Sequence, residues 1–368
     1  MKNEEARRFY IPELDGLRFF AFLLVFIHNA PYVESNLIWK ALHEYGWIGV
    51  DLFFCLSAFL ITKLLVLEHQ RAESINIKSF YTRRILRIWP LYFFYVFTVG
   101  FFQNWEPALF LQLLGLSTFS FNVIFLFITT GRVFAFVHLW SISYEEQFYG
   151  FIPWLLRYLT RKTENAKIRV LTLLFILGSI LRFIFIYLQV DHPAIYILPI
   201  THFESLLFGT ALGLGLLDKL LAKAQTWILF ITGISCIGLA MLLPSNYIVS
   251  NALMLTYPLS AVGMSLIITA AISNNSLLKN ILSNSVITHL GKISYGLYIF
   301  HIIGLILADF ICKNFFGFTS QQFNKYSILT FALGLSLTLT FSLISYRFIE
   351  APFLKLKKYF TNTLSTTA

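Results

Sequence analysis

Charged side chains are scarce in this sequence. Asp, Glu, Lys and Arg together make up 12% of the 368 residues, about half the share usual in a soluble globular domain. A soluble fold of this size could not cover its surface with so few charges. Cysteine is also rare: there are three, in or at the ends of apolar runs and without CxxC spacing. They give no indication of a metal or redox site.

Apolar residues take the place of the missing charges. Hydrophobic residues make up 57% of the chain, which includes 40 Phe. About twenty consecutive apolar residues suffice for a helix to cross a bilayer. The sequence therefore predicts an all-α, polytopic transmembrane helical bundle. Its apolar runs lie at about 17–33, 47–67, 88–103, 107–130, 139–156, 168–190, 195–217, 225–243, 248–272, 293–312 and 326–348.

The formal net charge is +10, from 28 Lys and Arg against 18 Asp and Glu. The basic residues cluster in short gaps between apolar runs, as in cytoplasmic loops, so the excess does not indicate nucleic-acid binding. If all these gaps are cytoplasmic, an even number of crossings separates each pair. The stretch 88–156 is the one exception: it contains three apolar runs between two basic gaps, where the rule allows two crossings.

The segment that fails to cross is expected at 107–136, where Pro107, Gly115 and Gly131 interrupt the apolar pattern and favour a partial or re-entrant helix. The sequence thus predicts about ten crossings with both termini in the cytoplasm. Eleven crossings with one terminus outside is the alternative.

The whole chain, 1–368, is expected to form a single membrane domain. A short polar segment (1–12) precedes it and a polar tail (353–368) ends it. Because Arg18 and His28 interrupt the first apolar run, a first transmembrane helix is a better interpretation than a cleavable signal peptide.

Ionisable groups at membrane depth are costly and therefore indicate function. Arg18 and His28 share the first run, ten residues or about 15 Å apart on a helix. Either could be structural, by snorkelling or as a buried imidazole. Asp51 opens the second run; it could be interfacial or a partner of His28. Arg84 and Arg87 lie on one helical face before the third run, where they suit either a phosphate-bearing ligand or anionic lipid.

The segment 138–149, HLWSISYEEQFY, is the most informative in the chain. The adjacent carboxylates Glu145 and Glu146 lie well inside an apolar run, where packing alone does not explain them. Glu145 is two turns from His138 and so shares its helical face. His301 is expected near mid-depth in the tenth run, as a core histidine or a functional one.

Taken together, these segments resemble the acyltransferase 3 family of integral membrane acyltransferases. The matching elements occur in family order: LDGLR at 14–18 followed by His28, GVDLFF at 49–54 with Ser57, Arg84 and Arg87, the segment 138–149, SYGLYIFH at 294–301, and YRFIEAP at 346–352.

The resemblance implies a ten-helix domain that takes an acyl group, usually acetyl, from cytoplasmic acyl-CoA. The acceptor would be a hydroxyl of an extracytoplasmic glycan or a lipid-linked sugar. No tightly bound cofactor or metal is implied. The resemblance also implies that the protein is located in a bacterial inner membrane.

On this hypothesis acyl-CoA is bound by Arg84, Arg87 and Arg18. Either His28 or His301 acts as general base or briefly carries the acyl group. Glu145 orients that imidazole, His138 helps to receive the acceptor, and Asp51 joins the catalytic group. The alternative is a transporter or flippase for a glycan or lipid-linked substrate, because buried Glu, His and Arg also build such pathways.

The chain departs from the family pattern at three places. The usual histidine position, eleven residues after the arginine, holds Asn29 here. His28 comes one residue earlier, which turns its side chain by about 100° around the helix. Ser57-Ala58 replaces Ser-Gly, and Thr201-His202 replaces Thr-Arg. The last change exchanges a permanent cation for a titratable group.

Overall fold

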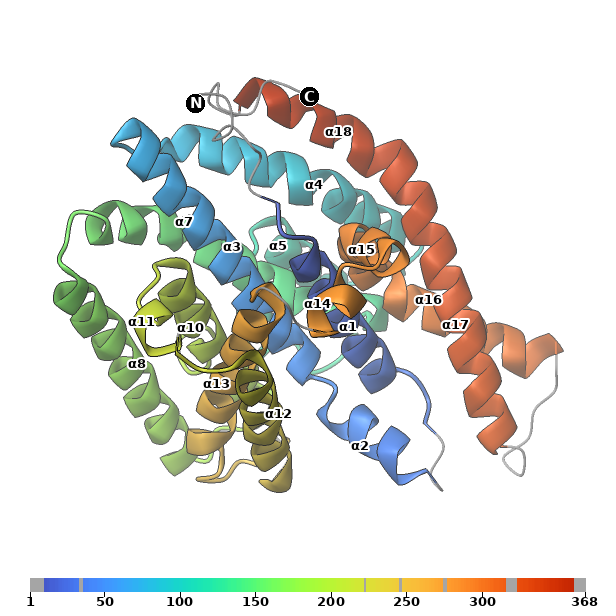
Figure 1. Cartoon of the computed structure of the whole chain (residues 1–368). Coiled ribbons are helices and arrows are strands. Elements are labelled where there is room, and N and C mark those ends of the chain that lie inside the picture. The colour runs from blue at the N-terminus through green and yellow to red at the C-terminus, as the bar shows by residue number, and fades with distance from the viewer. Residues whose placement is uncertain are drawn as a thin grey trace.

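The computed structural model describes residues 10–32, 36–221, 223–244, 247–273, 277–315 and 323–360. These residues form helices joined by turns and contain no strand, so the all-α prediction is confirmed (Figure 1). The elements in the first half of the chain are α1 (Pro12–Asn29), α2 (Leu37–Tyr45), α3 (Ile48–Ala72), α4 (Ile77–Phe101), α5 (Pro107–Ser117), α6 (Phe121–Ile124), η1 (Phe134–Leu139), α7 (Trp140–Leu159) and α8 (Glu164–Tyr187).

The second half of the chain contains shorter elements between its long helices. They are α9 (Ala194–Ile197), α10 (Glu204–Gly213), α11 (Asp218–Leu221), α12 (Thr226–Leu242), α13 (Leu253–Ile272), α14 (Leu277–Leu282), α15 (Ser285–Lys292), α16 (Ser294–Phe315), α17 (Phe323–Ser345), the π-helical turn η3 (Tyr346–Glu350), α18 (Ala351–Leu356) and η4 (Lys357–Phe360).

Local sequence sets several helix starts. Asn76 precedes α4 and its side chain accepts a hydrogen bond from the Ser79 N–H at 2.9 Å, which satisfies one of the free donors of the first turn. Pro12 and Pro107 lie in the first turns of α1 and α5, where a missing N–H costs nothing.

Five stretches of the described chain are long and apolar enough to cross a membrane: α3, α8, α13, α16 and the continuous stretch Lys325–Leu356. The chain is therefore an integral membrane protein. Helices α1, α4 and α7 have 18, 25 and 20 residues but are more polar. The expected number of about ten crossings stays a prediction.

Two apolar runs are broken into short pieces. Within 107–136, α5 has 11 residues, or about 17 Å, which is too short for a hydrocarbon core of about 30 Å. The run 195–217 was expected to be one crossing helix, and as a continuous helix that prediction is wrong. It forms α9 and the ten-residue α10, separated by 198–203. Leu198 precedes Pro199 and is extended, with ψ 127°, because a proline disfavours helical geometry in the residue before it.

Close helix contacts depend on small residues. Gly233 of α12 and Gly263 of α13 face each other, and a Cβ on Gly233 would lie 2.8 Å from the Gly263 carbonyl oxygen. Small residues of this kind let helix backbones approach in membranes. In the same way α10 packs along α3, and α1 packs between α3 and α15.

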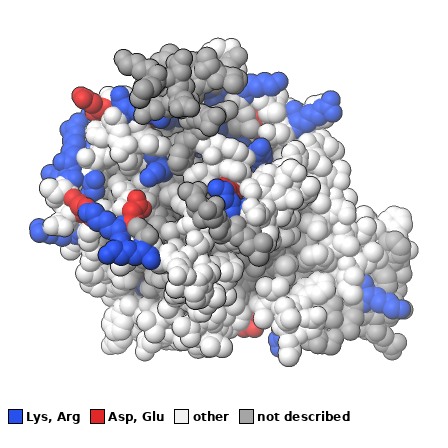
Figure 2. All heavy atoms as spheres, viewed as in Figure 1, with Lys and Arg blue, Asp and Glu red and all other residues white. Residues whose placement is uncertain are grey.

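The two ends of the bundle differ in charge. On the face shown in Figure 2, Lys and Arg gather over the upper part, on the side of α4 and α18, and the lower part is mostly uncharged. The tail expected from residue 353 begins as helix, in α18 and η4. Residues 1–9 and 361–368 of the predicted polar ends lie outside the described chain, and the single-domain prediction stays a prediction.

Candidate active site

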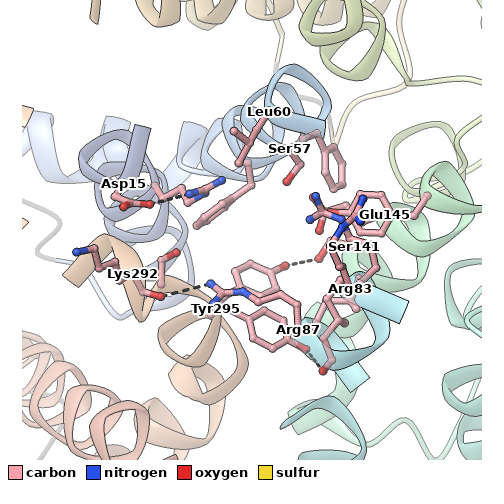
Figure 3. Close-up of a pocket in the computed structure, with 18 of the residues that line it drawn as sticks. Asp15, Ser57, Leu60, Arg83, Arg87, Ser141, Glu145, Lys292 and Tyr295 are labelled. Carbon is pink, nitrogen blue, oxygen red and sulfur yellow. Dashed lines mark hydrogen bonds and ion pairs between the residues drawn. The ribbon is translucent and has the colours of Figure 1, made fainter. Parts of the chain in front are cut away.

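A cavity of about 430 Å³ opens among α1, α3, α4, α7 and α16. Figure 3 shows side chains from these helices converging on it. Six of the lining side chains are cationic, and they come from segments far apart in the sequence. They are Arg18, Arg83, Arg84, Arg87, Lys292 and Lys357. Such a concentration of positive charge in a chain this poor in charge indicates an anionic ligand.

The cations differ in how far their charge is already compensated. Arg18 pairs with Asp15 at 2.7 Å, and Arg83 pairs with Glu68 at 3.1 Å. Arg87 donates only to the backbone carbonyl of Lys292, at 3.3 Å. Arg84 lies over the ring of Tyr149, 5.4 Å from its centroid. The predicted pair Arg84 and Arg87 therefore lines the cavity, and neither forms an ion pair with a described residue.

Glu145 projects from α7 into the same cavity. Its polar neighbours are the hydroxyls of Ser57 and Tyr149 and the guanidinium groups of Arg84 and Arg18. This differs from the expected arrangement, in which Glu145 orients an imidazole. Glu146 points elsewhere, where it accepts a hydrogen bond from the Trp89 indole at 3.4 Å. The two adjacent carboxylates thus have different surroundings.

One wall of the cavity ends at a pair of hydroxyl groups. The oxygens of Ser141 and Tyr298 lie 2.5 Å apart, and both residues line the cavity. Next to them, but outside the lining, are the rings of His138 and His301, with centroids 4.9 Å apart. The His301 ring is 5.4 Å from that of Tyr298.

In each of these two histidines one ring nitrogen forms a hydrogen bond and the other has no partner among the described residues. His301 Nδ1 lies 2.6 Å from the Tyr298 carbonyl oxygen, so this nitrogen carries a proton. Its Nε2 is buried without a partner. His138 Nε2 donates to the Ile299 carbonyl at 3.1 Å, and its Nδ1 has no partner. Each neutral ring therefore keeps one unused acceptor nitrogen.

His28 is not part of this cavity. It lies in the last turn of α1, where Nδ1 donates to the His43 carbonyl at 2.6 Å and Nε2 accepts from the Tyr247 hydroxyl at 3.1 Å. Both nitrogens are thus engaged. With His43 and Tyr247 it lines a second, separate cavity of about 320 Å³. His43 is partly buried there.

Asp51 is fully buried and pairs with His202 at 3.1 Å, rather than with His28 as considered from the sequence. The other nitrogen of His202 faces the Tyr196 carbonyl at 2.9 Å. Both ring nitrogens of His202 thus face an oxygen atom. One proton therefore lies between Nδ1 and the Tyr196 carbonyl, and a second lies between Nε2 and the Asp51 carboxylate. His202, which stands where the sequence resemblance expects an arginine, is thus the hydrogen-bond partner of Asp51.

A second buried ion pair lies beside this one. Arg182 of α8 pairs with Glu204, the first residue of α10. Arg182 also donates to the Thr201 carbonyl at 2.9 Å. These contacts hold the break between α9 and α10 against α8.

Of the predicted site residues, the structure brings Arg18, Arg84, Arg87 and Glu145 into one cavity. His138 and His301 adjoin it, whereas Asp51 and His28 lie elsewhere. Sequence reasoning missed several neighbours of the site, although some lie within the motifs already singled out. The missed residues are Ser141, Tyr149, Lys292, Tyr295 and Tyr298.

Comparison with known proteins adds a further observation. The sequence model of an acyltransferase domain family, acyltransferase 3, matches residues 11–347. The chain is 28% identical over 369 aligned residues to the O-acetyltransferase OatA of Staphylococcus aureus strain NCTC 8325 / PS 47, which covers 94% of this chain and 57% of that protein. It is equally similar to the putative O-acetyltransferase SACOL0978 of S. aureus strain COL, with 94% and 58% coverage.

The chain thus spans little more than half the length of these relatives. No solved structure matches it.

Proposed function

Because the chain belongs to the acyltransferase 3 family, we propose that it is a membrane-embedded O-acyltransferase. It moves an acyl group, acetyl by analogy with the names of its relatives, from cytoplasmic acyl-CoA to a hydroxyl of an extracytoplasmic glycan or glycolipid. The observation that carries the proposal is the first cavity. Six cationic side chains and Glu145 line it, and its lining residue Tyr298 lies next to the His138–His301 pair.

The cationic lining supports acyl-CoA as the donor. Coenzyme A carries several phosphate charges, and planar guanidinium groups bind phosphate through two parallel hydrogen bonds. Arg84 and Arg87 are the best placed for this, since neither forms an ion pair with a described carboxylate. Arg18, already paired with Asp15, contributes less to phosphate binding.

His301 is the group best suited to act as general base. In the proposed step, its Nε2 takes the proton of the acceptor hydroxyl while the hydroxyl oxygen attacks the thioester carbonyl carbon. The carbon–oxygen bond forms, the carbon–sulfur bond breaks, and the CoA thiolate leaves and takes up the proton from the imidazolium. The Tyr298 carbonyl fixes the tautomer that this role requires.

Glu145 acts on the donor side of the same step. Its carboxyl group faces Arg84 and Arg18 and thereby keeps these guanidinium groups in the cavity. His138, 4.9 Å from His301, completes the pair at the end of the cavity.

The proposed orientation places the basic end of the bundle in the cytoplasm. The positive-inside rule supports this, because on the face shown most Lys and Arg lie over the upper part of the bundle, the end that holds α4 and α18. Acyl-CoA would then enter the first cavity from the cytoplasm, with both termini on that side of a bacterial inner membrane.

The proposal is tested with purified protein in lipid vesicles. Radiolabelled acetyl-CoA and a glycan fraction from cell envelopes are supplied, and released CoA and labelled glycan are measured. Transfer should be lost in Glu145→Gln and Arg84→Ala and kept in Arg161→Ala, which removes an exposed arginine at the end of α7. Absence of acetyl-CoA binding and consumption by the intact protein would instead favour a transporter or flippase.

A further inference from the structure

The second cavity has a composition unlike that of the first. It has a volume of about 320 Å³ and lies between the last turn of α1, helix α2 and the segment that joins α12 to α13. Among the described residues no aliphatic side chain lines it. The described lining consists of His28, Tyr32, Lys40, His43, Glu44 and Tyr247.

Aromatic rings form its walls. The rings of Tyr32 and His43 stack with centroids 4.5 Å apart and an angle of 28° between their planes. Tyr247 lies nearly parallel to His28, at 6.4 Å and 19°, and also contacts His192 at 4.6 Å. Tyr247 remains 52% exposed, so part of its surface is accessible to a ligand.

Hydrogen bonds hold these rings in place. His28 is fixed through both nitrogens, by the His43 carbonyl and the Tyr247 hydroxyl. Burial raises the pKa of Tyr247, so the phenol keeps the proton that it donates to His28. The cavity is thus formed before any ligand arrives, with Lys40 and Glu44 as additional donor and acceptor.

This lining selects among ligand classes. An acyl chain would find no aliphatic side chain among the described lining residues. A polyanion would meet one permanent cation among them, Lys40, and Glu44 as an opposing charge. A sugar fits both features, since its C–H faces pack on aromatic rings and its hydroxyls hydrogen-bond to charged and phenolic groups.

The position of the second cavity complements that of the first. Arg18 and His28 lie about 15 Å apart along α1, and α2 lies at the end of the molecule away from α4 and α18 (Figure 1). The hydroxyl pair Ser141–Tyr298 forms part of the wall of the first cavity, and the rings of His138 and His301 lie next to this pair. His28 is close enough to His301 to influence it electrostatically.

We propose that the second cavity binds the acceptor, as a neutral, hydroxyl-rich carbohydrate, from the side of the membrane opposite the acyl-CoA cavity. This inference rests on the proposed function. The aromatic faces of Tyr32 and Tyr247 hold the sugar ring, while Lys40 and Glu44 bind its hydroxyls.

The test separates acceptor binding from donor binding. Glycan released from cell envelopes and tritiated by borohydride reduction serves as one probe, and radiolabelled acetyl-CoA as the other. Tyr32→Ala and Tyr247→Ala are expected to raise the glycan concentration for half-maximal binding at least ten-fold and to leave acetyl-CoA binding unchanged. Tyr187→Ala, which removes a 77% exposed tyrosine from the end of α8, is the matched control.

Conservative variants guard against misfolding. Tyr32→Phe keeps the ring and should bind glycan nearly as well as the unmodified protein. Glycan binding that depends on Tyr32 and Tyr247 but occurs without acetyl transfer would support a carbohydrate site in the second cavity and overturn the proposed transferase function. Transfer with normal glycan dependence in both alanine variants would overturn the acceptor site alone, and an intact protein that binds no glycan would overturn it as well.

Discussion

The ion pair between Arg182 and Glu204 gives a quantitative prediction. Their side chains are 0% and 4% exposed, and Nε and Nη2 of Arg182 have no hydrogen-bond partner. Glu204→Gln would remove the negative charge and leave the guanidinium with neutral partners, among them the Thr201 carbonyl and the ring of Tyr257, 5.4 Å away. Breaking a buried pair in this way costs about 3–5 kcal/mol. The folding equilibrium constant should fall by roughly 10²- to 4 × 10³-fold.

An exposed pair in the same protein provides the control. Lys219 and Glu164 lie 2.8 Å apart with side chains 82% and 47% exposed. Glu164→Gln makes the same chemical change, but such pairs contribute about 0–1 kcal/mol. Both variants are unfolded by titration with sodium dodecyl sulfate in mixed micelles and followed by circular dichroism.

A double variant identifies the cause. Arg182→Met combined with Glu204→Gln removes the charge that the single change leaves unpaired, so it should recover at least half of the lost unfolding free energy. Equal losses for Glu204→Gln and Glu164→Gln, or a double variant no more stable than Glu204→Gln, would refute the assignment of this cost to an uncompensated buried charge.

Three further predictions follow from the same structure. Arg84→Ala should weaken acetyl-CoA binding at least ten-fold, about 1.4 kcal/mol, as measured by equilibrium dialysis; unchanged affinity would contradict phosphate binding by this residue. Gly233→Ala places a methyl group 2.8 Å from a carbonyl oxygen of α13, whereas Gly238→Ala on the same helix meets open space. The first should lower the unfolding free energy by about 1–3 kcal/mol and the second should not, and equal unfolding midpoints would argue against close packing of α12 and α13. A reporter active only outside the cytoplasm should work when fused after residue 132 and fail after residue 163; the reverse pattern would mean that 107–136 crosses the membrane.

The helical class was predictable because the apolar runs are long and the charges between them are few. The interruption of 107–136 was equally visible in Pro107, Gly115 and Gly131. The division of 195–217 was not recognised, although Pro199 indicated it, because hydropathy averages over a single proline. The length of the helix in this run therefore depends on Pro199, a single residue that the average hydropathy of the run does not reveal.

The site was predictable in part. Arg18, Arg84 and Glu145 were identified because ionisable residues in an apolar run require an explanation. Their convergence on one cavity, however, depends on how α1, α4 and α7 pack. Asp51 pairs with His202, 151 residues away, and His28 pairs with Tyr247, 219 residues away. Pairs so far apart produce no periodic pattern in the sequence from which they could be predicted. Contacts of that separation are set by tertiary packing.

The continuous stretch Lys325–Leu356 has 32 residues and is therefore about 48 Å long, against a hydrocarbon thickness of about 30 Å. A helix this long must tilt or leave one end among the lipid headgroups. The end in question carries Tyr346 and adjoins Lys357, both of which line the first cavity. We therefore expect bilayer thickness to affect side chains of the cavity in which the proposed donor would bind. If the chain binds acyl-CoA as proposed, its affinity for acetyl-CoA is expected to differ between vesicles made from phospholipids of different acyl-chain length, and membrane lipid composition would then influence the proposed transfer.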